Sequence, residues 1–186
     1  MEKPISRKIG STQLLILLGD ITEQPTEAIV NAANPSLRGG GGVDGAIHRA
    51  GGRQILEQCQ TYTRKHGSLP SGKAMVTTGG KLRAKYVIHT VGPVYKNEQE
   101  SAPILQSAYQ ESLKLAEESK ITSVSFPSIS TGAYRYPLQA AAEVAVKAVI
   151  DCLRAGSALQ LVQIVCFTKN TFTAYKMALE EITEQA

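Results

Sequence analysis

AIVNAANPSLRGGGGVDGAIHRAGG, residues Ala28 to Gly52, runs from a short apolar segment through four successive glycines into a segment with helical spacing. Glycine loses more backbone entropy on folding than any other residue, so a run of four weakens a fold unless bare backbone is needed there. A glycine-rich turn that opens into a helix exposes backbone N–H groups at the positive end of the helix dipole, which suits an anion such as phosphate. The stretch therefore predicts a strand, an anion-binding loop and a helix, in that order.

Strands and helices are expected to alternate along the rest of the chain. Apolar, β-branched runs predict strands at Gln13–Leu18, Ala28–Ala32, Ala74–Thr78, Tyr86–Val91, Ser123–Phe126 and Leu161–Phe167. Several of these runs are nearly continuous, which is typical of strands buried on both faces. Helical patterns lie at Val43–Ala50, Arg53–His66, Ala102–Glu118, Leu138–Ala155 and Thr171–Glu184. The alternation predicts an α/β fold in which helices cover both faces of the sheet.

Local signals refine this arrangement. The segment GGKLRAK between the third and fourth predicted strands is too short for a crossover helix, so that pair is expected to be antiparallel and the sheet mixed. Pro137 suits the first turn of the helix at Leu138–Ala155, which is expected to stop at Gly156. Asn170 is a candidate cap for the last helix.

Length and composition indicate one globular domain spanning residues 1–186. The chain is 42% hydrophobic and 19% charged, as in ordinary globular proteins. It shows neither an apolar run of membrane-spanning length nor a signal peptide, so we expect a cytoplasmic protein. Three cysteines, Cys59, Cys152 and Cys166, are far apart and lack metal-ligand spacing, so we expect reduced thiols and no zinc site.

The net charge of +4 is concentrated in one part of the chain. No acidic residue lies between Glu57 and Glu98, whereas seven basic residues do: Arg64, Lys65, Lys73, Lys81, Arg83, Lys85 and Lys96. A solvated basic face is the favoured interpretation, and attraction to a polyanion such as nucleic acid is the alternative. The one aromatic residue next to the first six is Tyr86, which directly follows Lys85, so no platform for stacking bases is evident.

Four segments with unusual chemistry follow predicted strands. They are Gly19–Thr22, the glycine loop (Gly39–Gly42), Ser128–Pro137 (SISTGAYRYP) and Phe167–Asn170. Ligands of open α/β sheets collect beyond the carboxyl ends of the strands, so we expect the four segments to line one cleft. Two of them open into helices, an arrangement that suits a diphosphate. The common nucleotide fingerprints GxxxxGK[ST] and GxGxxG are missing.

Single residues in these segments leave alternatives open. Asp20 could cap the following turn, which is favoured, or accept a hydrogen bond from an adenine amino group. Phe167 could be core, which is favoured, or stack on a base. Asn31 and Asn34 could bind sugar hydroxyls or serve turn geometry. Asp44 stands apart, because an acid among anion-binding groups is costly unless it orients water or a hydroxyl.

The histidines are expected to have structural roles. His48 follows Asp44 by one helical turn, and capping or packing is favoured over chemistry. His89 lies within the apolar run YVIHTV and is expected to be a core histidine, as Cys166 is expected to be a core thiol. No Ser–His–Asp or Cys–His arrangement is evident from residue order.

Taken together, GDIT (Gly19–Thr22), AIVNAANPSLRGGGGVDGAIHRAGG, VIHTVGP (Val87–Pro93) and SISTGAYRYP make the chain resemble the macro domain family from about Leu15 to Ala178. The resemblance is greatest to the MacroD-type branch, which includes bacterial O-acetyl-ADP-ribose deacetylases and ADP-ribosyl hydrolases. It implies a three-layer α/β/α sandwich with a mixed, mostly parallel sheet that binds ADP-ribose across the strand ends.

The resemblance also implies roles for residues of this chain. Asp20 would recognise the adenine amino group, Ile21 would contact the ring through its backbone, and Phe167 would lie against it. The residues that would wrap the diphosphate and distal ribose are Asn31, Gly41, Gly42, Val43, Ser130, Thr131, Gly132 and Ala133. Asn34, Asp44 and Tyr134 would form the catalytic end. Relatives often have an acid in place of Thr168 and glycine in place of Arg135, so the contacts of these two residues are open.

The implied activity is metal-independent hydrolysis without a cofactor, with ADP-ribose as product. The substrate would be mono-ADP-ribose on acidic protein side chains, O-acetyl-ADP-ribose, or both, with Asp44 orienting or deprotonating water. The alternatives are a non-catalytic reader of ADP-ribosylated proteins, a hydrolase of ADP-ribosylated nucleic acid, and a regulatory partner that binds another enzyme or RNA independently of catalysis. No membrane partner is expected.

Overall fold

A seven-stranded sheet forms the centre of the protein, which we describe from a computed structural model covering residues 2–185. The strands are β1 (Ile5–Ile9), β2 (Thr12–Leu18), β3 (Ala28–Ala32), β4 (Ala74–Thr78), β5 (Tyr86–Thr90), β6 (Ser123–Phe126) and β7 (Leu161–Cys166). Their order is β1-β2-β7-β6-β3-β5-β4. The five inner strands are parallel to one another, and the two edge strands are antiparallel to their neighbours. The mixed sheet and the antiparallel β4–β5 pair are confirmed.

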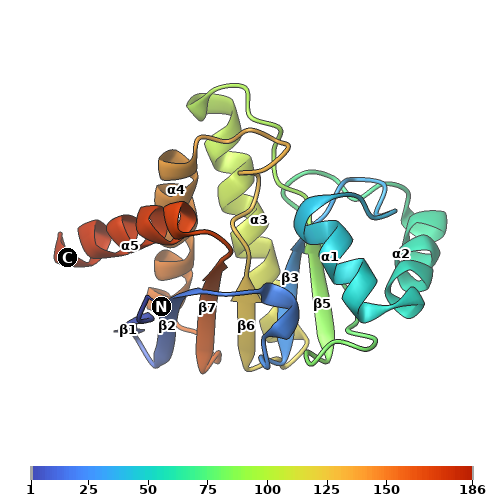
Figure 1. The fold of residues 1–186 in the computed structure, drawn as a ribbon, viewed down its shortest axis with the longest axis horizontal. Coiled ribbons are helices and arrows are strands. Elements are labelled where there is room, and N and C mark those ends of the chain that lie inside the picture. Colours follow the sequence, from blue (N-terminus) through green and yellow to red (C-terminus); the bar gives the residue numbers. More distant parts are fainter. Residues whose placement is uncertain (1, 186) are drawn as a thin grey trace.

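Helices cover both faces of this sheet, which makes three layers. They are α1 (Gly42–Gly51), α2 (Arg53–His66), α3 (Glu98–Glu118), α4 (Leu138–Arg154) and α5 (Lys169–Glu184), with a short 3₁₀ helix, η1 (Ile21–Glu23). In Figure 1, α4 and α5 lie at the β1–β2 end and α1 and α2 at the β3–β5 end. The three-layer α/β/α architecture is confirmed.

Both faces of the inner strands are apolar because each strand contributes to two cores. On β3, Val30 packs in the core formed with α3, α4 and α5, whereas its neighbour Ile29 packs in the core beneath α1 and α2. On β7, Ile164 and Val165 divide in the same way. Successive strand residues point to opposite faces, so continuous apolar runs are required for a doubly covered sheet.

Two elements differ from the sequence-based expectation: one strand was not predicted, and one helix begins earlier than predicted. Strand β1 was not predicted. In this edge strand Ile5, Arg7 and Ile9 alternate with the exposed Ser6 and Lys8. The strand is short and rich in charge, as edge strands often are. Helix α3 begins at Glu98 rather than Ala102, because the Asn97 side chain caps it by accepting a hydrogen bond from the Glu100 N–H. The helix therefore continues through Pro103.

The cap of α5 is also different from the prediction. The helix begins at Lys169, and the Thr168 hydroxyl oxygen accepts a hydrogen bond from the Thr171 N–H at 3.2 Å. Asn170 lies inside the first turn, so its assignment as the cap was wrong. The two side chains are equally short and polar, and only the backbone turn after β7 decides which of them occupies the cap.

This difference gives a matched pair of variants. Thr168→Ala is expected to lower the free energy of unfolding by about 1 kcal/mol, because an N-cap hydrogen bond is lost. Asn170→Ala, at an exposed position two residues away, is expected to change it by less than about 0.5 kcal/mol. Urea unfolding followed by circular dichroism measures both, and equal losses would contradict the assignment of the cap.

Candidate functional site

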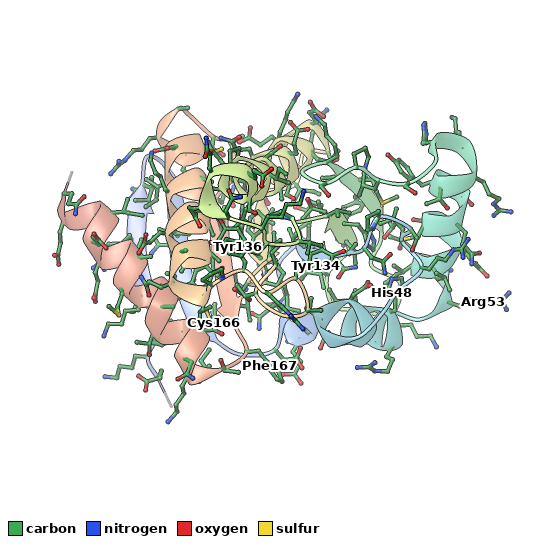
Figure 2. All side chains as sticks on the ribbon, turned by 90° about the horizontal axis from the view of Figure 1, so that it is seen from above. His48, Arg53, Tyr134, Tyr136, Cys166 and Phe167 are labelled. Carbon is green, nitrogen blue, oxygen red and sulfur yellow. The ribbon has the colours of Figure 1, made fainter. Side chains whose placement is uncertain are left out.

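The four segments predicted to form a cleft all lie at one edge of the sheet. The strands β2, β3, β6 and β7 are parallel, and the segments follow their carboxyl ends. Figure 2 views the molecule from above this edge, and Phe167, Tyr134 and His48 follow one another across it from the α5 side to the α1 side. The predicted convergence of these loops is confirmed.

The glycine loop leads into α1 without any side-chain cap. Gly41 is the N-cap residue and makes no side-chain hydrogen bond, and a methyl group added to Gly41 or Gly42 would meet nothing within 4 Å. Gly39 and Gly42 adopt φ values of +84° and +57°, which side chains other than glycine rarely adopt. The first-turn N–H groups of α1 therefore receive no side-chain cap from Gly41, and such groups can donate to an anion.

Asp44 lies in the first turn of α1 and is 6% exposed. The Asn31 side-chain amide donates to Asp44 Oδ1 at 2.8 Å, and His48 Nε2 lies 3.3 Å from the same oxygen. The other oxygen, Oδ2, faces Gly40, where an added methyl group would lie 3.4 Å from it. The carboxylate is thus held from behind and presents one oxygen to the glycine loop.

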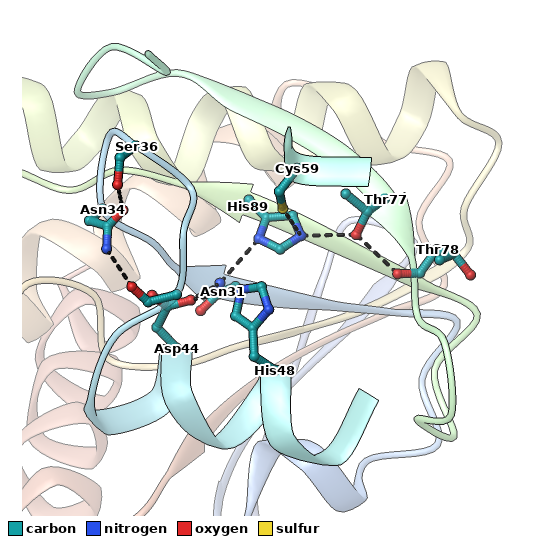
Figure 3. Close-up of polar contacts among 10 residues, drawn as sticks. Asn31, Asn34, Ser36, Asp44, His48, Cys59, Thr77, Thr78 and His89 are labelled. Atoms are coloured by element: carbon teal, nitrogen blue, oxygen red, sulfur yellow. Dashed lines mark hydrogen bonds and ion pairs between the residues drawn. The ribbon is translucent and has the colours of Figure 1, made fainter. Parts of the chain in front are cut away.

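Asn34 lies close to the same glycine. Its amide donates to the Gly39 carbonyl at 2.9 Å, its oxygen accepts from the Ser36 hydroxyl at 2.7 Å, and an added methyl group at Gly40 would lie 3.7 Å from its amide nitrogen. Asn34 and Asp44 therefore both lie beside Gly40. Figure 3 shows these two side chains. Sequence separation alone did not establish this pairing.

The second loop, Ser128–Pro137, contributes a buried hydroxyl and an aromatic ring. Ser130 adopts φ +67°, and its hydroxyl is buried without a hydrogen-bond partner among residues 2–185. The loop is tied down where the Tyr136 N–H donates to the Ser130 carbonyl at 2.9 Å and the Tyr95 N–H to the Tyr134 carbonyl at 2.9 Å. Gly132 is open to its surroundings. The loop thus offers Ser130, Thr131, Gly132 and Ala133 at the strand edge.

The far end of the edge carries Asp20, Ile21 and Phe167. Asp20 caps η1 by accepting hydrogen bonds at Oδ1 from the Thr22 N–H at 2.8 Å and the Thr22 hydroxyl at 2.7 Å, so the capping interpretation is confirmed. Ile21 is buried in the core, and its carbonyl accepts a hydrogen bond from the Gln24 N–H at 3.3 Å. Phe167 is 79% exposed, so its expected place in the core was wrong. The reason is that β7 ends at Cys166 and no layer covers the residue after it.

A buried polar cluster behind Asp44 was not predicted. Ligand atoms of His48, Cys59 and His89 lie within 4.8 Å of one another, and His89 also contacts Asn31 and Thr77. Burial, and then His48, lower the pKa of His89 to about 3 against the opposing effect of Asp44. Burial, and then Asp44, raise the pKa of Cys59 to about 12. These residues are far apart in the sequence, so no spacing signal could have found the cluster.

The remaining expectations about these residue types are met. The three cysteines are free, and Cys166 and His89 are both fully buried. The seven basic side chains between Arg64 and Lys96 are all exposed, as a solvated basic face requires. Among residues 2–185, no helix has the length and hydropathy needed to cross a membrane.

The low pKa of His89 predicts a pH dependence of stability. Below its ordinary pKa of 6.5 the unfolded chain binds a proton at His89 that the folded protein does not, so stability is complete above pH 6.5 and is lost as pH falls toward 3. The slope from this one group approaches ~1.4 kcal/mol per pH unit. Urea unfolding of the protein and of His89→Gln across this range isolates the contribution; curves that stay parallel would contradict it.

Comparison with known proteins places this geometry in a family. The Macro domain profile matches residues 30–145, which include the glycine loop, Asp44 and the second loop. The chain belongs to the Macro domain family. It is 46% identical over 171 residues to the O-acetyl-ADP-ribose deacetylase of Escherichia coli K12, covering 91% of this chain and 97% of that protein. It is 47% identical to a macro domain-containing protein of Caldanaerobacter subterraneus, with the same coverage.

Solved macro domain structures share the fold across the whole sheet. The Oceanobacillus iheyensis macrodomain with ADP superposes with a TM-score of 0.95 at 38% identity, covering 99% of this chain and 98% of that one. The Trypanosoma brucei macrodomain in complex with ADP-ribose gives 0.83 at 36% identity, covering 89% of this chain and 68% of that one. The resemblance noted from the sequence motifs is therefore confirmed at the level of family and fold.

Proposed function

We propose that this macro domain binds ADP-ribose along the carboxyl edge of its sheet and hydrolyses O-acetyl-ADP-ribose. The observation that carries the proposal is the buried Asp44 carboxylate, which lies beside Gly40 together with Asn34 in a chain 46% identical to an O-acetyl-ADP-ribose deacetylase. A catalytic carboxylate needs a fixed orientation and a neighbouring anion site that holds substrate, and both occur here within one turn of helix.

The ligand would lie along the edge from η1 to α1. Thr22 occupies Asp20 Oδ1, so Oδ2 can accept from the adenine amino group, while the exposed Phe167 ring offers a stacking face. The diphosphate would accept hydrogen bonds from the N–H groups of Gly41, Gly42 and Val43 and from the loop Ser130–Ala133. The distal ribose would then reach Asn34, Asp44 and Tyr134, and Asn31 would act from behind Asp44.

The reaction would be general-base hydrolysis of the acetyl ester. Asp44 takes a proton from a water molecule, and the water oxygen bonds to the ester carbonyl carbon. The bond between that carbon and the ribose oxygen breaks, the ribose oxygen takes a proton, and acetate and ADP-ribose leave. A positioned general base contributes typically ~10²–10⁴-fold. The anomeric carbon is the alternative point of attack when the ester joins ADP-ribose to a protein carboxylate, and we propose such mono-ADP-ribosylated acidic side chains as a second substrate.

Two measurements test the proposal separately. Calorimetry with ADP-ribose is expected to show one site per chain, and absence of heat at high micromolar ligand would reject the binding site itself. Incubation with O-acetyl-ADP-ribose and with a mono-ADP-ribosylated protein, followed by chromatography of free ADP-ribose, tests the chemistry. Binding without turnover of either substrate would identify a reader rather than a hydrolase.

A further inference from the structure

A line of buried hydrogen bonds runs inward from Asp44 to the strand β4. Asn31 Nδ2 lies 2.8 Å from Asp44 Oδ1 and 3.1 Å from His89 Nδ1, and His89 Nε2 lies 2.9 Å from Thr77 Oγ1. Thr77 Oγ1 in turn lies 3.0 Å from the Thr78 carbonyl oxygen. The side chains of the line come from α1, β3, β5 and β4, and none of the four residues that supply them is more than 6% exposed. Figure 3 shows the line from Asn31 through His89 to Thr78.

The two ends of this line fix the direction of every hydrogen bond in it. An ionised carboxylate only accepts, so Asn31 must turn its NH₂ group toward Asp44, and the second N–H of that group then points at His89 Nδ1. Nδ1 must therefore accept, which places the ring proton on Nε2, where Thr77 Oγ1 accepts it. The Thr77 hydroxyl hydrogen goes to the Thr78 carbonyl, which can only accept.

The unpaired atom of the cluster agrees with this direction. Asn31 Oδ1 is buried without a partner among residues 2–185. Turning the amide over would place that oxygen against the Asp44 carboxylate, which only accepts, and would remove the bond that Asn31 donates to it. Buried amide oxygens are rarely left unpaired. We therefore attribute the orientation of the Asn31 amide to the Asp44 carboxylate and His89 Nδ1, which accept its two hydrogens.

We infer that His89 and Thr77 are positioning residues: they hold the Asn31 amide, and through it the Asp44 carboxylate, with Oδ2 turned toward Gly40. This inference rests on the proposed function of Asp44. His89 acts as a neutral imidazole with its proton on Nε2, and Thr77 selects that tautomer. The arrangement keeps Asp44 Oδ1 hydrogen-bonded to Asn31 and leaves Oδ2 available to water. In the same way, the hydrogen-bond partner of one ring nitrogen orients a metal-ligating histidine.

The same residues could instead hold a soft divalent metal, because His48, Cys59 and His89 are close enough to share one ion. Two features favour the hydrogen-bond line. The Nε2 atom that lies 3.8 Å from Cys59 Sγ carries the proton donated to Thr77, and burial keeps the Cys59 thiol protonated by raising its pKa to about 12. Metal binding would require both protons to leave a closed site.

The test uses two substitutions at Thr77. Thr77→Val keeps the branched shape of the side chain but removes the acceptor for His89, whereas Thr77→Ser keeps the hydroxyl. We expect kcat for O-acetyl-ADP-ribose to fall about tenfold in Thr77→Val, with the Kd of ADP-ribose within about twofold of wild type. Thr77→Ser is expected to restore kcat to within about twofold, although it loses a methyl group that the valine variant retains. A role in packing alone would give the opposite order.

Nitrogen NMR of the His89 ring gives a readout that does not depend on activity. The wild type is expected to show a proton on Nε2 and none on Nδ1, and Thr77→Val is expected to lose this single tautomer. A wild-type proton on Nδ1, or an active wild type whose kcat is unchanged by Thr77→Val, overturns the inference. So does one equivalent of Cd²⁺ that produces a thiolate absorption band and shifts the ring nitrogens. If the wild-type protein binds ADP-ribose but does not turn over substrate, the proposed hydrolysis is rejected. Nitrogen NMR of the His89 ring then still tests the line of hydrogen bonds by itself.

Discussion

Asp44→Ala is expected to lower kcat for O-acetyl-ADP-ribose hydrolysis by about 10²–10⁴-fold, the usual contribution of a positioned general base. The carboxylate is 6% exposed and presents Oδ2 beside Gly40, so bulk water cannot replace it from the same direction. The Kd of ADP-ribose is expected to change only a few-fold, because the diphosphate contacts come from backbone N–H groups. Single-turnover release of ADP-ribose and calorimetry measure the two effects separately.

Asp151→Ala is the matched control for this variant. Asp151 is an exposed carboxylate that pairs with Lys147 one turn earlier on α4. Its removal is expected to leave kcat and Kd at wild-type values, since exposed ion pairs contribute little even to stability. Hydrolysis at the original rate by folded Asp44→Ala would show that another group activates water.

Gly45→Ala is expected to weaken ADP-ribose binding about ten- to hundredfold by displacing the glycine loop. A methyl group at Gly45 would lie 2.4 Å from the Gly40 carbonyl oxygen, which is backbone and can yield only if the loop moves. Overpacking of this kind costs typically ~1–3 kcal/mol, and each ~1.4 kcal/mol is tenfold in Kd. Gly40 lies beside both Asn34 and Asp44, so the shift also disturbs the catalytic end.

Calorimetry with ADP-ribose measures this effect, and Ala50→Val is its control. Ala50 is exposed on the same helix, so the added carbons meet solvent rather than the loop. Its Kd is expected to stay within about twofold of wild type. Urea unfolding of Gly45→Ala shows whether the protein remains folded, and an unchanged Kd in the folded variant would mean that the loop tolerates displacement.

The parts of the fold that could be predicted are those encoded by local spacing. Helix α2 and the strands β3, β4 and β6 have the predicted bounds, because continuous apolar runs and helical periods describe burial directly. The failures have local causes. Strand β1 has β2 as its one strand partner, and the caps of α3 and α5 depend on backbone angles rather than on residue type.

For the candidate site, the glycine loop, the second loop and Asp44 could be selected from the sequence, since each breaks a rule of ordinary folding. Phe167 could not be placed, because an aromatic residue after an apolar strand is core or exposed according to where the next layer ends. The line from Asp44 to Thr77 joins four elements and carries no motif.

The sequence by itself therefore determined the family, the alternation of strands and helices, and the loops that can hold an anion, since these depend on neighbours along the chain. Only the tertiary structure decided that Asp44 and Asn34 lie beside one glycine, that Phe167 is exposed, and that His89 stands behind Asn31. The physical reason is that burial and the direction of hydrogen bonds arise where strands β3, β5 and β4 lie side by side, and sequence separation does not encode that contact.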